Sequence, residues 1–216
     1  MSSSPAPREP SWPALLAALV VVLLYLALPD GLTLGPNWIV SIIAGVVLAI
    51  LAVTGPARHP KEAAHLRPLT IALTAVLSVA NASSAALLVW HLLGHGIRPV
   101  SGSMLISAGL AVWLSNIAVF ALWYWEFDSG GPAARIASGR PAEGRGWMFA
   151  QDTVSDYPTW RPGFVDYLYL SITNQTAFSP TDTLPLRSGA KVLMGFQGLL
   201  SMVIIGLVVA RAVNIL

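Results

Sequence analysis

The stretch of residues 166–185 is the feature that most constrains how this chain folds. Its first half is aromatic and apolar, its second half is polar, and an apolar run over residues 192–213 follows. The stretch is too short and too polar to cross a bilayer and come back. Irregular backbone is tolerated at membrane depth only where protein or a water-filled cavity surrounds it. The sequence therefore predicts a re-entrant loop, which is a candidate pore or binding site.

The composition places the chain among membrane proteins. Hydrophobic residues make up 55% of it, charged residues only 10%, and the mean hydropathy is +0.68. The chain has no cysteine, which excludes disulfides, thiolate metal ligands and cysteine nucleophiles. The net charge of +2, carried by basic residues in loops, gives no support for a nucleic-acid partner.

The apolar runs predict an all-α membrane protein with five transmembrane helices and a re-entrant loop between the fourth and the fifth. The first run, although it follows Arg8, lacks a small-residue cleavage site and is interpreted as a retained helix. The predicted regions are a flexible tail over residues 1–11, a three-helix region over 12–103 and a pore-like region over 104–216. The first three helices are expected over residues 13–28, 37–53 and 69–93. The pore-like region divides into an outer helix over 104–125, an extramembrane loop over 126–163, a pore helix over 164–176, a filter-like loop over 177–186 and an inner helix over 190–214.

The pore-like region has polar residues at a recognisable spacing. Ser171 lies inside the predicted pore helix and Thr176 at its end, and Asp182, Pro185 and Lys191 follow. In this order and spacing the chain resembles the pore domain of tetrameric potassium-channel-like cation channels, and it is also similar to bacterial multi-pass membrane proteins with a comparable C-terminal segment. The resemblance covers residues 104–216. It implies a homotetramer in a cell membrane, such as the bacterial inner membrane, that is surrounded by lipid and passes monovalent cations.

The filter itself differs from that of the family. The resembled channels have glycines that allow successive carbonyls to point inward, and this chain has none between Thr173 and Arg187. Pro180 fixes its own φ and favours an extended Ser179, so the usual carbonyl ladder is not expected. Hydroxyl groups and a ring of Asp182 carboxylates would attract cations without complete dehydration, which predicts weak selectivity. The candidate pore and filter residues are Thr176, Ala177, Phe178, Ser179, Pro180, Thr181 and Asp182.

The resemblance also assigns roles in the helices around the loop. An alignment through Lys191 implies an apolar inner-helix lining, with Gly206 at a point where the helix can bend. The aromatic residues Tyr167, Tyr169 and Phe178 are expected to wedge between the outer and inner helices. The implied lining residues are Met202, Ile205, Val209 and Val213.

A second interpretation of the loop stays open. Ser179 and Asp182 also fit a capped helix start with Pro180 at its first position. Asp182 would then be a capping residue, or a partner of Arg187 or Lys191. The loop would plug the protein, which would be a non-conducting structural or accessory membrane protein.

No pattern of an enzyme, a metal site or a cofactor site emerges from the sequence. His91 and His95 are four residues apart, but no third ligand accompanies them, and we interpret them as interfacial histidines. Small polar residues in the third and fourth helices are interpreted as packing contacts that hydrogen-bond between helices. They are Ser78, Asn81, Ser83, Ser84, Ser115 and Asn116.

The charges predict an orientation that conflicts with the resemblance. Arg58, Lys61 and Arg67 lie in the expected linker between the second and third helices, and basic linkers of this kind remain cytoplasmic. The third and fourth helices separate this linker from residues 126–163, and two crossings return the chain to the same side. This segment and the mouth of the loop would therefore also lie in the cytoplasm. The resembled channels face this mouth outward.

Overall fold

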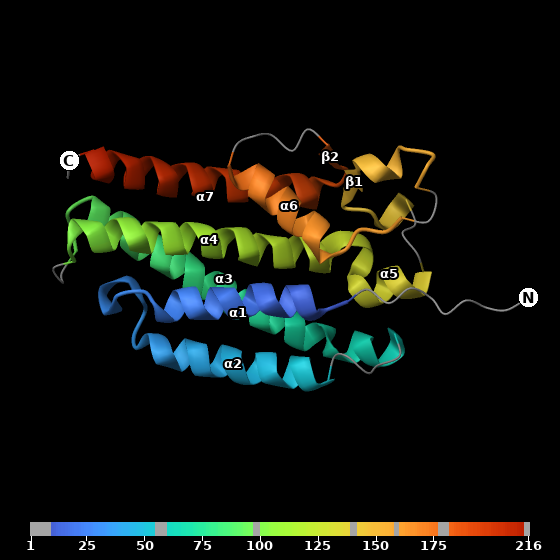
Figure 1. Ribbon diagram of the computed structural model, residues 1–216, viewed down its shortest axis with the longest axis horizontal. Helices are drawn as coiled ribbons and strands as arrows, with labels where there is room; N and C mark the ends of the chain where they lie inside the picture. The colour runs from blue at the N-terminus through green and yellow to red at the C-terminus, as the bar shows by residue number, and fades with distance from the viewer. Residues whose placement is uncertain are drawn as a thin grey trace, which may run out of the picture.

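The computed structural model describes residues 10–54, 60–96, 100–138, 142–157, 160–176 and 182–213. This part of the chain is mostly helical, with a small two-stranded sheet at one end of the helix bundle (Figure 1). The helices are α1 (Trp12–Leu26), α2 (Asn37–Thr54), α3 (Pro60–Leu92), α4 (Gly102–Phe127), α5 (Pro132–Ser138), α6 (Phe164–Gln175) and α7 (Ser188–Val213). The strands are β1 (Trp147–Phe149) and β2 (Thr183–Pro185).

Four helical segments are long and apolar enough to cross a membrane, and α1 is a shorter apolar helix. The four segments are Asn37–Thr54, His65–Leu92, Gly102–Gly130 and Ser188–Val213. Large apolar side chains on the outer faces of α2 and α7 stay exposed, for example Val53 at 82% and Leu199 at 68%. Such wide apolar surfaces are unfavourable in water and favourable in lipid. The mostly helical fold expected from the sequence is thereby confirmed, and the described part of the chain contains helices that could span a membrane.

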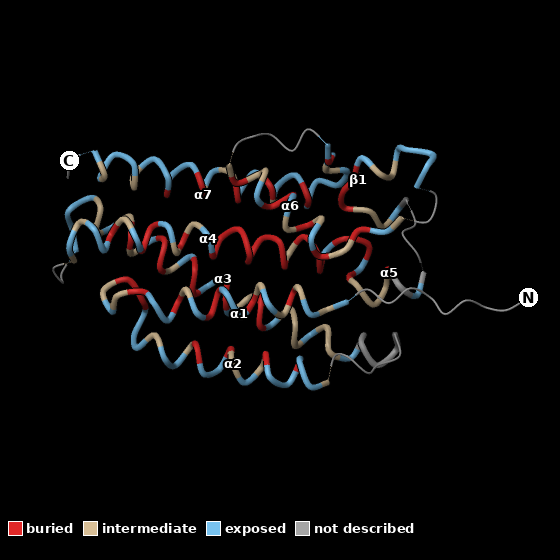
Figure 2. Tube along the Cα trace, viewed as in Figure 1, coloured by how far each residue is buried: buried red, intermediate tan, exposed pale blue. Residues whose placement is uncertain are grey.

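The core of the bundle is built around α4. This helix packs against α1, α3, α6 and α7, and Figure 2 shows it as the most buried of the long helices. Small side chains on α4 permit this crowding, because they let neighbouring helices approach closely. At Gly109 the approach is closest, since an added Cβ would overlap Cγ2 of Val208 in α7.

The third helix is longer than expected. It begins at Pro60 and not near Leu69, so residues 60–68 are helical and not part of a loop. A proline at the first helical position costs little, because its missing N–H would have no partner there in any case. Pro68 is accommodated inside the helix.

The described part of residues 126–163 forms short elements of secondary structure. After α4 ends, the described chain forms α5, β1 and several short 3₁₀ turns. Aromatic side chains from this segment are buried: Trp147 is 1% and Phe149 is 4% exposed. The strand β1 pairs antiparallel with β2, in the register Met148 opposite Leu184. Therefore β2 lies within the stretch that we expected to be a filter-like loop.

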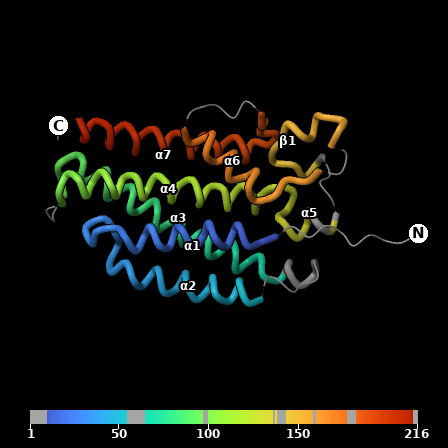
Figure 3. Tube along the Cα trace, in the orientation of Figure 1, coloured from blue at the N-terminus to red at the C-terminus, as the bar shows by residue number. Residues whose placement is uncertain are grey.

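The first helix begins and the last helix ends at opposite ends of the bundle (Figure 3). The start of α1 lies at the end that also carries α5 and the β1–β2 sheet, whereas α7 finishes at the other end. The five helices α1, α2, α3, α4 and α7 alternate in direction along the long axis.

Candidate functional site

The short helix α6 enters the bundle beside α4 and stops partway along it. Its first residue, Phe164, stacks edge-on against Trp125 near the end of α4, at a centroid distance of 5.9 Å. Its last residue, Gln175, contacts Trp113 and Asn116 in the middle of α4. With 12 residues, α6 is about 18 Å long. The chain then returns to β2, at the end where α6 began.

Local sequence explains the start of α6. Arg161-Pro162-Gly163 precedes the helix, and the N–H of Gly163 donates to Oδ2 of Asp166 over 2.7 Å. The carboxylate also lies in the first turn, where it suits the positive end of the helix dipole. The helix expected after Gly163 and the place of Asp166 in its first turn are confirmed.

A chain of buried amide side chains holds the far end of α6. Nδ2 of Asn81 in α3 donates to Oδ1 of Asn116 over 3.3 Å, and Nδ2 of Asn116 donates to Oε1 of Gln175 over 2.7 Å. Nε2 of Gln197 in α7 donates to the same Gln175 oxygen over 3.0 Å. These four side chains are each 5% exposed or less. They join α3, α4, α6 and α7 at one level of the bundle, and we call them the amide layer.

Hydroxyl groups complete the connections of the amide layer. Oγ of Ser171 accepts from Gln197 over 2.7 Å and donates to the carbonyl of Ile117 over 2.7 Å. Oγ of Ser201 donates to the carbonyl of Gln175 over 2.8 Å, and Nε1 of Trp113 donates to that hydroxyl over 3.0 Å. Side-chain amides in a hydrocarbon environment are unfavourable unless paired in this way. The layer therefore fixes the end of α6 between α4 and α7.

The interpretation of the small polar residues as packing contacts is confirmed for Asn81 and Asn116, which bond across the bundle. It is also confirmed for Ser78, whose hydroxyl accepts from Nε1 of Trp123 over 2.8 Å. Ser83 bonds only within its own helix, to the carbonyl of Ala80. Oγ of Ser84 is buried and has no hydrogen-bond partner in the described structure.

A second polar cluster lies where α4 ends. Asp128 is fully buried, and its two carboxylate oxygens accept from the hydroxyl of Tyr167 over 2.6 Å and from the N–H of Gly146 over 2.7 Å. Arg135 is 1% exposed, and its Nη1 donates to the carbonyls of Trp125 and Asp128 over 2.7 and 2.8 Å. The guanidinium also lies over the Tyr167 ring, at 5.2 Å from its centroid. This end of the protein thus has a charged, closely packed interior.

An ion pair attaches α3 to the same region. Nε of Arg67 donates to Oε1 of Glu126 over 3.1 Å, and Nη2 of Arg67 donates to the Glu126 carbonyl over 3.3 Å. Gly131, at φ +92, makes this possible, because an added Cβ would lie 3.1 Å from Nε of Arg67.

The structure places two of the seven candidate filter residues. Thr176 ends α6, where its hydroxyl donates to the carbonyl of Ile172 over 2.8 Å, and Asp182 is exposed just before β2. The other five, Ala177, Phe178, Ser179, Pro180 and Thr181, lie outside the described residues. On α7, the four implied lining residues all lie on the exposed surface of the single chain.

The aromatic wedge expected between the outer and inner helices is not confirmed for either of the two described residues. Tyr167 is fully buried between α4 and the sheet, with its ring edge-on to Phe149 at 5.4 Å. Tyr169 is 56% exposed because it lies on the opposite face of α6. Phe178 lies outside the described residues.

The histidine pair does not form a metal site in the described structure. Nδ1 of His91 lies 2.9 Å from the carbonyl of Leu87, and the His95 ring lies against Trp90 at 4.6 Å. No group of three or more ligating side chains occurs among the described residues.

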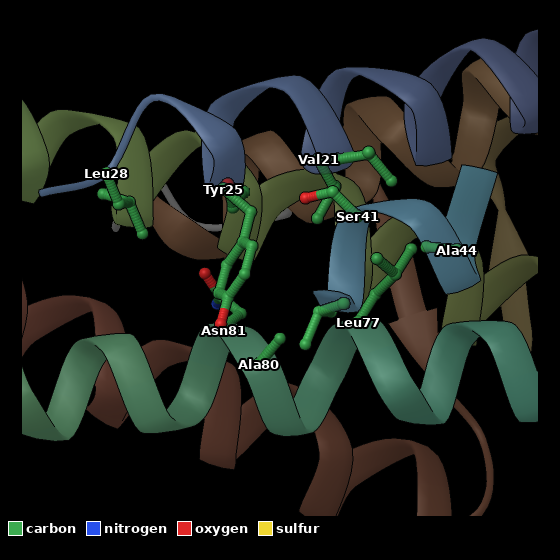
Figure 4. A pocket seen from close by; sticks show the side chains of 11 residues that line it. Val21, Tyr25, Leu28, Ser41, Ala44, Leu77, Ala80 and Asn81 are labelled. Atoms are coloured by element: carbon green, nitrogen blue, oxygen red, sulfur yellow. The ribbon is translucent and has the colours of Figure 1, made fainter. Parts of the chain in front are cut away.

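One small cavity lies between α1, α2, α3 and α4 (Figure 4). Its walls are mostly apolar, with Tyr25, Ser41, Asn81 and Ser115 as polar members. Its volume of about 10 Å³ leaves room for about one water molecule. It is too small for an organic substrate.

Sequence reasoning did not find Gln175, Gln197 and Asp128 as site residues. The signal was present, because a glutamine or carboxylate inside an apolar helix, or directly after one, is costly without a partner. Comparison with models of protein families, with curated proteins and with solved structures finds no match for this chain.

Proposed function

We propose that this chain is one subunit of a homo-oligomeric, potassium-channel-like cation channel of weak selectivity. On this proposal α1, α2, α3, α4 and α7 cross the cell membrane. Helix α6 and residues 177–186 form the re-entrant loop, and four chains surround one path for monovalent cations.

The placement of Gln175 carries the proposal. Phe164, which begins α6, and β2, which follows the loop, lie near one end of α4. Gln175, which ends α6, lies against the middle of α4. A helix of about 18 Å is too short for a hydrocarbon core of about 30 Å, so α6 would end inside the membrane. The carbonyl end of a helix has partial negative charge, which favours a cation close to Thr176.

The exposed face of α7 supports an assembly around a central axis. Met202 is 65%, Ile205 is 46% and Val209 is 55% exposed in the single chain. A ring of four such faces would give an apolar inner path, which gates by excluding water.

One observation favours the alternative of a non-conducting protein with a plugged loop. The polar groups that surround the end of α6 are bonded to one another, as in the pairs Asn116–Gln175 and Gln175–Gln197. A saturated network offers no groups to a passing ion. The loop would then stabilise the bundle or present a docking surface at the membrane.

Flux measurements separate the two functions. The purified protein would be placed in liposomes that contain potassium, sodium or a large organic cation, with protein-free liposomes as the control. We expect potassium and sodium to pass at similar rates and the large cation to be retained. A strict monomer in mild detergent together with no flux would contradict the channel. Strong preference for potassium would contradict the weak selectivity.

A further inference from the structure

The carboxylate of Asp128 connects to the segments on both sides of the loop. We call α6 the entering limb and β2 the returning limb. Oδ2 of Asp128 accepts the hydroxyl of Tyr167, which belongs to the entering helix α6. Oδ1 of Asp128 accepts the N–H of Gly146, the residue before β1. Since β1 pairs with β2, and β2 follows the loop, the same side chain holds the entering limb directly and the returning limb through the sheet.

Further contacts join Gly146 and β1 to the chain that follows the loop. The carbonyl of Gly146 accepts the N–H of Leu186 over 2.8 Å, directly after β2. Nε1 of Trp147 also lies 3.1 Å from Sδ of Met194 in α7. A shift of Gly146 would therefore move Leu186 and the strand β2 that precedes it.

The carboxylate is itself held in place. Asp128 is fully buried, and its carbonyl accepts Nη1 of Arg135. The next residues turn sharply, with φ +54 at Ser129 and +92 at Gly131, a backbone that only a constrained turn maintains. Hydrogen bonds to a buried carboxylate are among the strongest in proteins. Asp128 is thus a fixed point and not an adjustable surface charge.

We propose that Asp128 is a positioning residue that fixes the two limbs of the loop relative to each other and so sets which ions the loop admits. This inference rests on the proposed channel function. Asp182 directly precedes β2 in the sequence, so a displacement of β2 against α6 would also move Asp182 relative to Thr176. A displaced Asp182 would change the place of the carboxylate that the channel proposal puts at the mouth.

Three substitutions distinguish an effect of Asp128 on the position of the loop from an effect of its charge. D128A removes both hydrogen bonds, and Y167F removes only the bond to α6. D128N removes the charge and keeps the shape: its amide oxygen still accepts from Gly146, and its amide nitrogen donates to the Tyr167 hydroxyl. D156A removes an exposed carboxylate in the same segment and is the control for a general loss of charge.

Backbone hydrogen exchange reports the positions without any need for conduction. In D128A we expect exchange over residues 146–149 and 183–186 to be about tenfold faster or more, because a charged hydrogen bond to Gly146 is lost. D156A should exchange as the parent does, and D128N, which keeps a neutral hydrogen bond to Gly146, should stay closer to the parent than to D128A. Y167F should leave these residues protected, because the hydrogen bond from Gly146 to Asp128 is intact.

Ion preference in liposomes is the second measurement. D128A and Y167F should both change the cation-over-anion ratio by several-fold, whereas D128N and D156A should keep the ratio of the parent. If D128A does not assemble, the contrast between Y167F and D128N decides the matter.

Each contrary result has a separate meaning. Unchanged exchange in D128A would show that Asp128 does not hold the sheet and would overturn the proposal. An altered ratio in D128N equal to that of D128A would show that Asp128 acts by its charge, which also overturns it. If the parent protein conducts nothing, the channel function fails, and the exchange data still decide whether Asp128 holds the sheet.

Discussion

Asn116 in the middle of α4 donates a hydrogen bond of 2.7 Å to the side chain of Gln175, the last residue of α6. This bond joins the end of the short helix to the most buried helix of the bundle. Because both side chains are buried, neither amide has water as an alternative partner.

The Asn116–Gln175 bond should be visible in stability. We expect Asn116→Leu to lower the free energy of unfolding in detergent by about 1 to 2 kcal/mol, because the amides of Asn81 and Gln175 lose a partner. Ser107→Ala is the matched control, since this exposed hydroxyl on α4 bonds only within its own helix. The double variant with Gln175→Leu should cost less than the sum of the two single changes. Additive costs would contradict a direct coupling.

Asp182 offers a test of charge at the loop mouth. If four Asp182 side chains surround a path, Asp182→Asn should lower cation flux and the cation-over-anion ratio while the oligomer stays assembled. Asp156→Asn, at another exposed carboxylate, should change neither. If Asp182 caps a turn or pairs with a neighbouring cation, the change would cost on the order of 1 kcal/mol in stability and leave ion preference as it was.

The placement of α7 around an axis leads to a prediction about Ile205. Ile205→Ser should raise conductance, because a hydroxyl makes a narrow apolar constriction easier to wet. Val203→Ser is the control, because Val203 lies on a different side of α7, is 50% exposed and is expected to face lipid. Equal effects of the two substitutions on flux would remove the central placement of Ile205.

Orientation is testable because the chain has no cysteine. The basic residues near the start of α3 predict that residues 126–163 face the cytoplasm. A cysteine introduced at the exposed Ser155 should then react with a membrane-impermeant reagent only after the cells are permeabilised. Labelling in intact cells would establish the outward mouth of the resembled channels.

The sequence was most informative where structure is local. The bounds of α6 follow from Pro162 and Gly163 before it, from its apolar pattern and from the Asp166 cap. The predicted start of α3 was wrong because residues 60–68 were interpreted as part of a linker, whereas Pro60 begins the helix and Pro68 lies inside it.

The supports of the loop could not be predicted in the same way. The strands β1 and β2 have three residues each and pair across a separation of more than thirty residues, so neither has an alternation long enough to recognise. The partners of Gln175 come from α4 and α7, and no spacing along the chain specifies an amide pair between helices. Such contacts depend on how helices pack, which the sequence pattern of one helix does not contain.

The ion pair between Arg67 and Glu126 has a consequence for how the protein is made. The two residues are 59 positions apart, so at about 5 to 20 residues per second Glu126 is synthesised on the order of 3 to 12 s after Arg67. During that interval α3 is already available for insertion, and Glu126 does not yet exist to neutralise the arginine. The charge of Arg67 therefore acts in full when the orientation of α3 is decided, and it is paired with Glu126 only when α4 arrives.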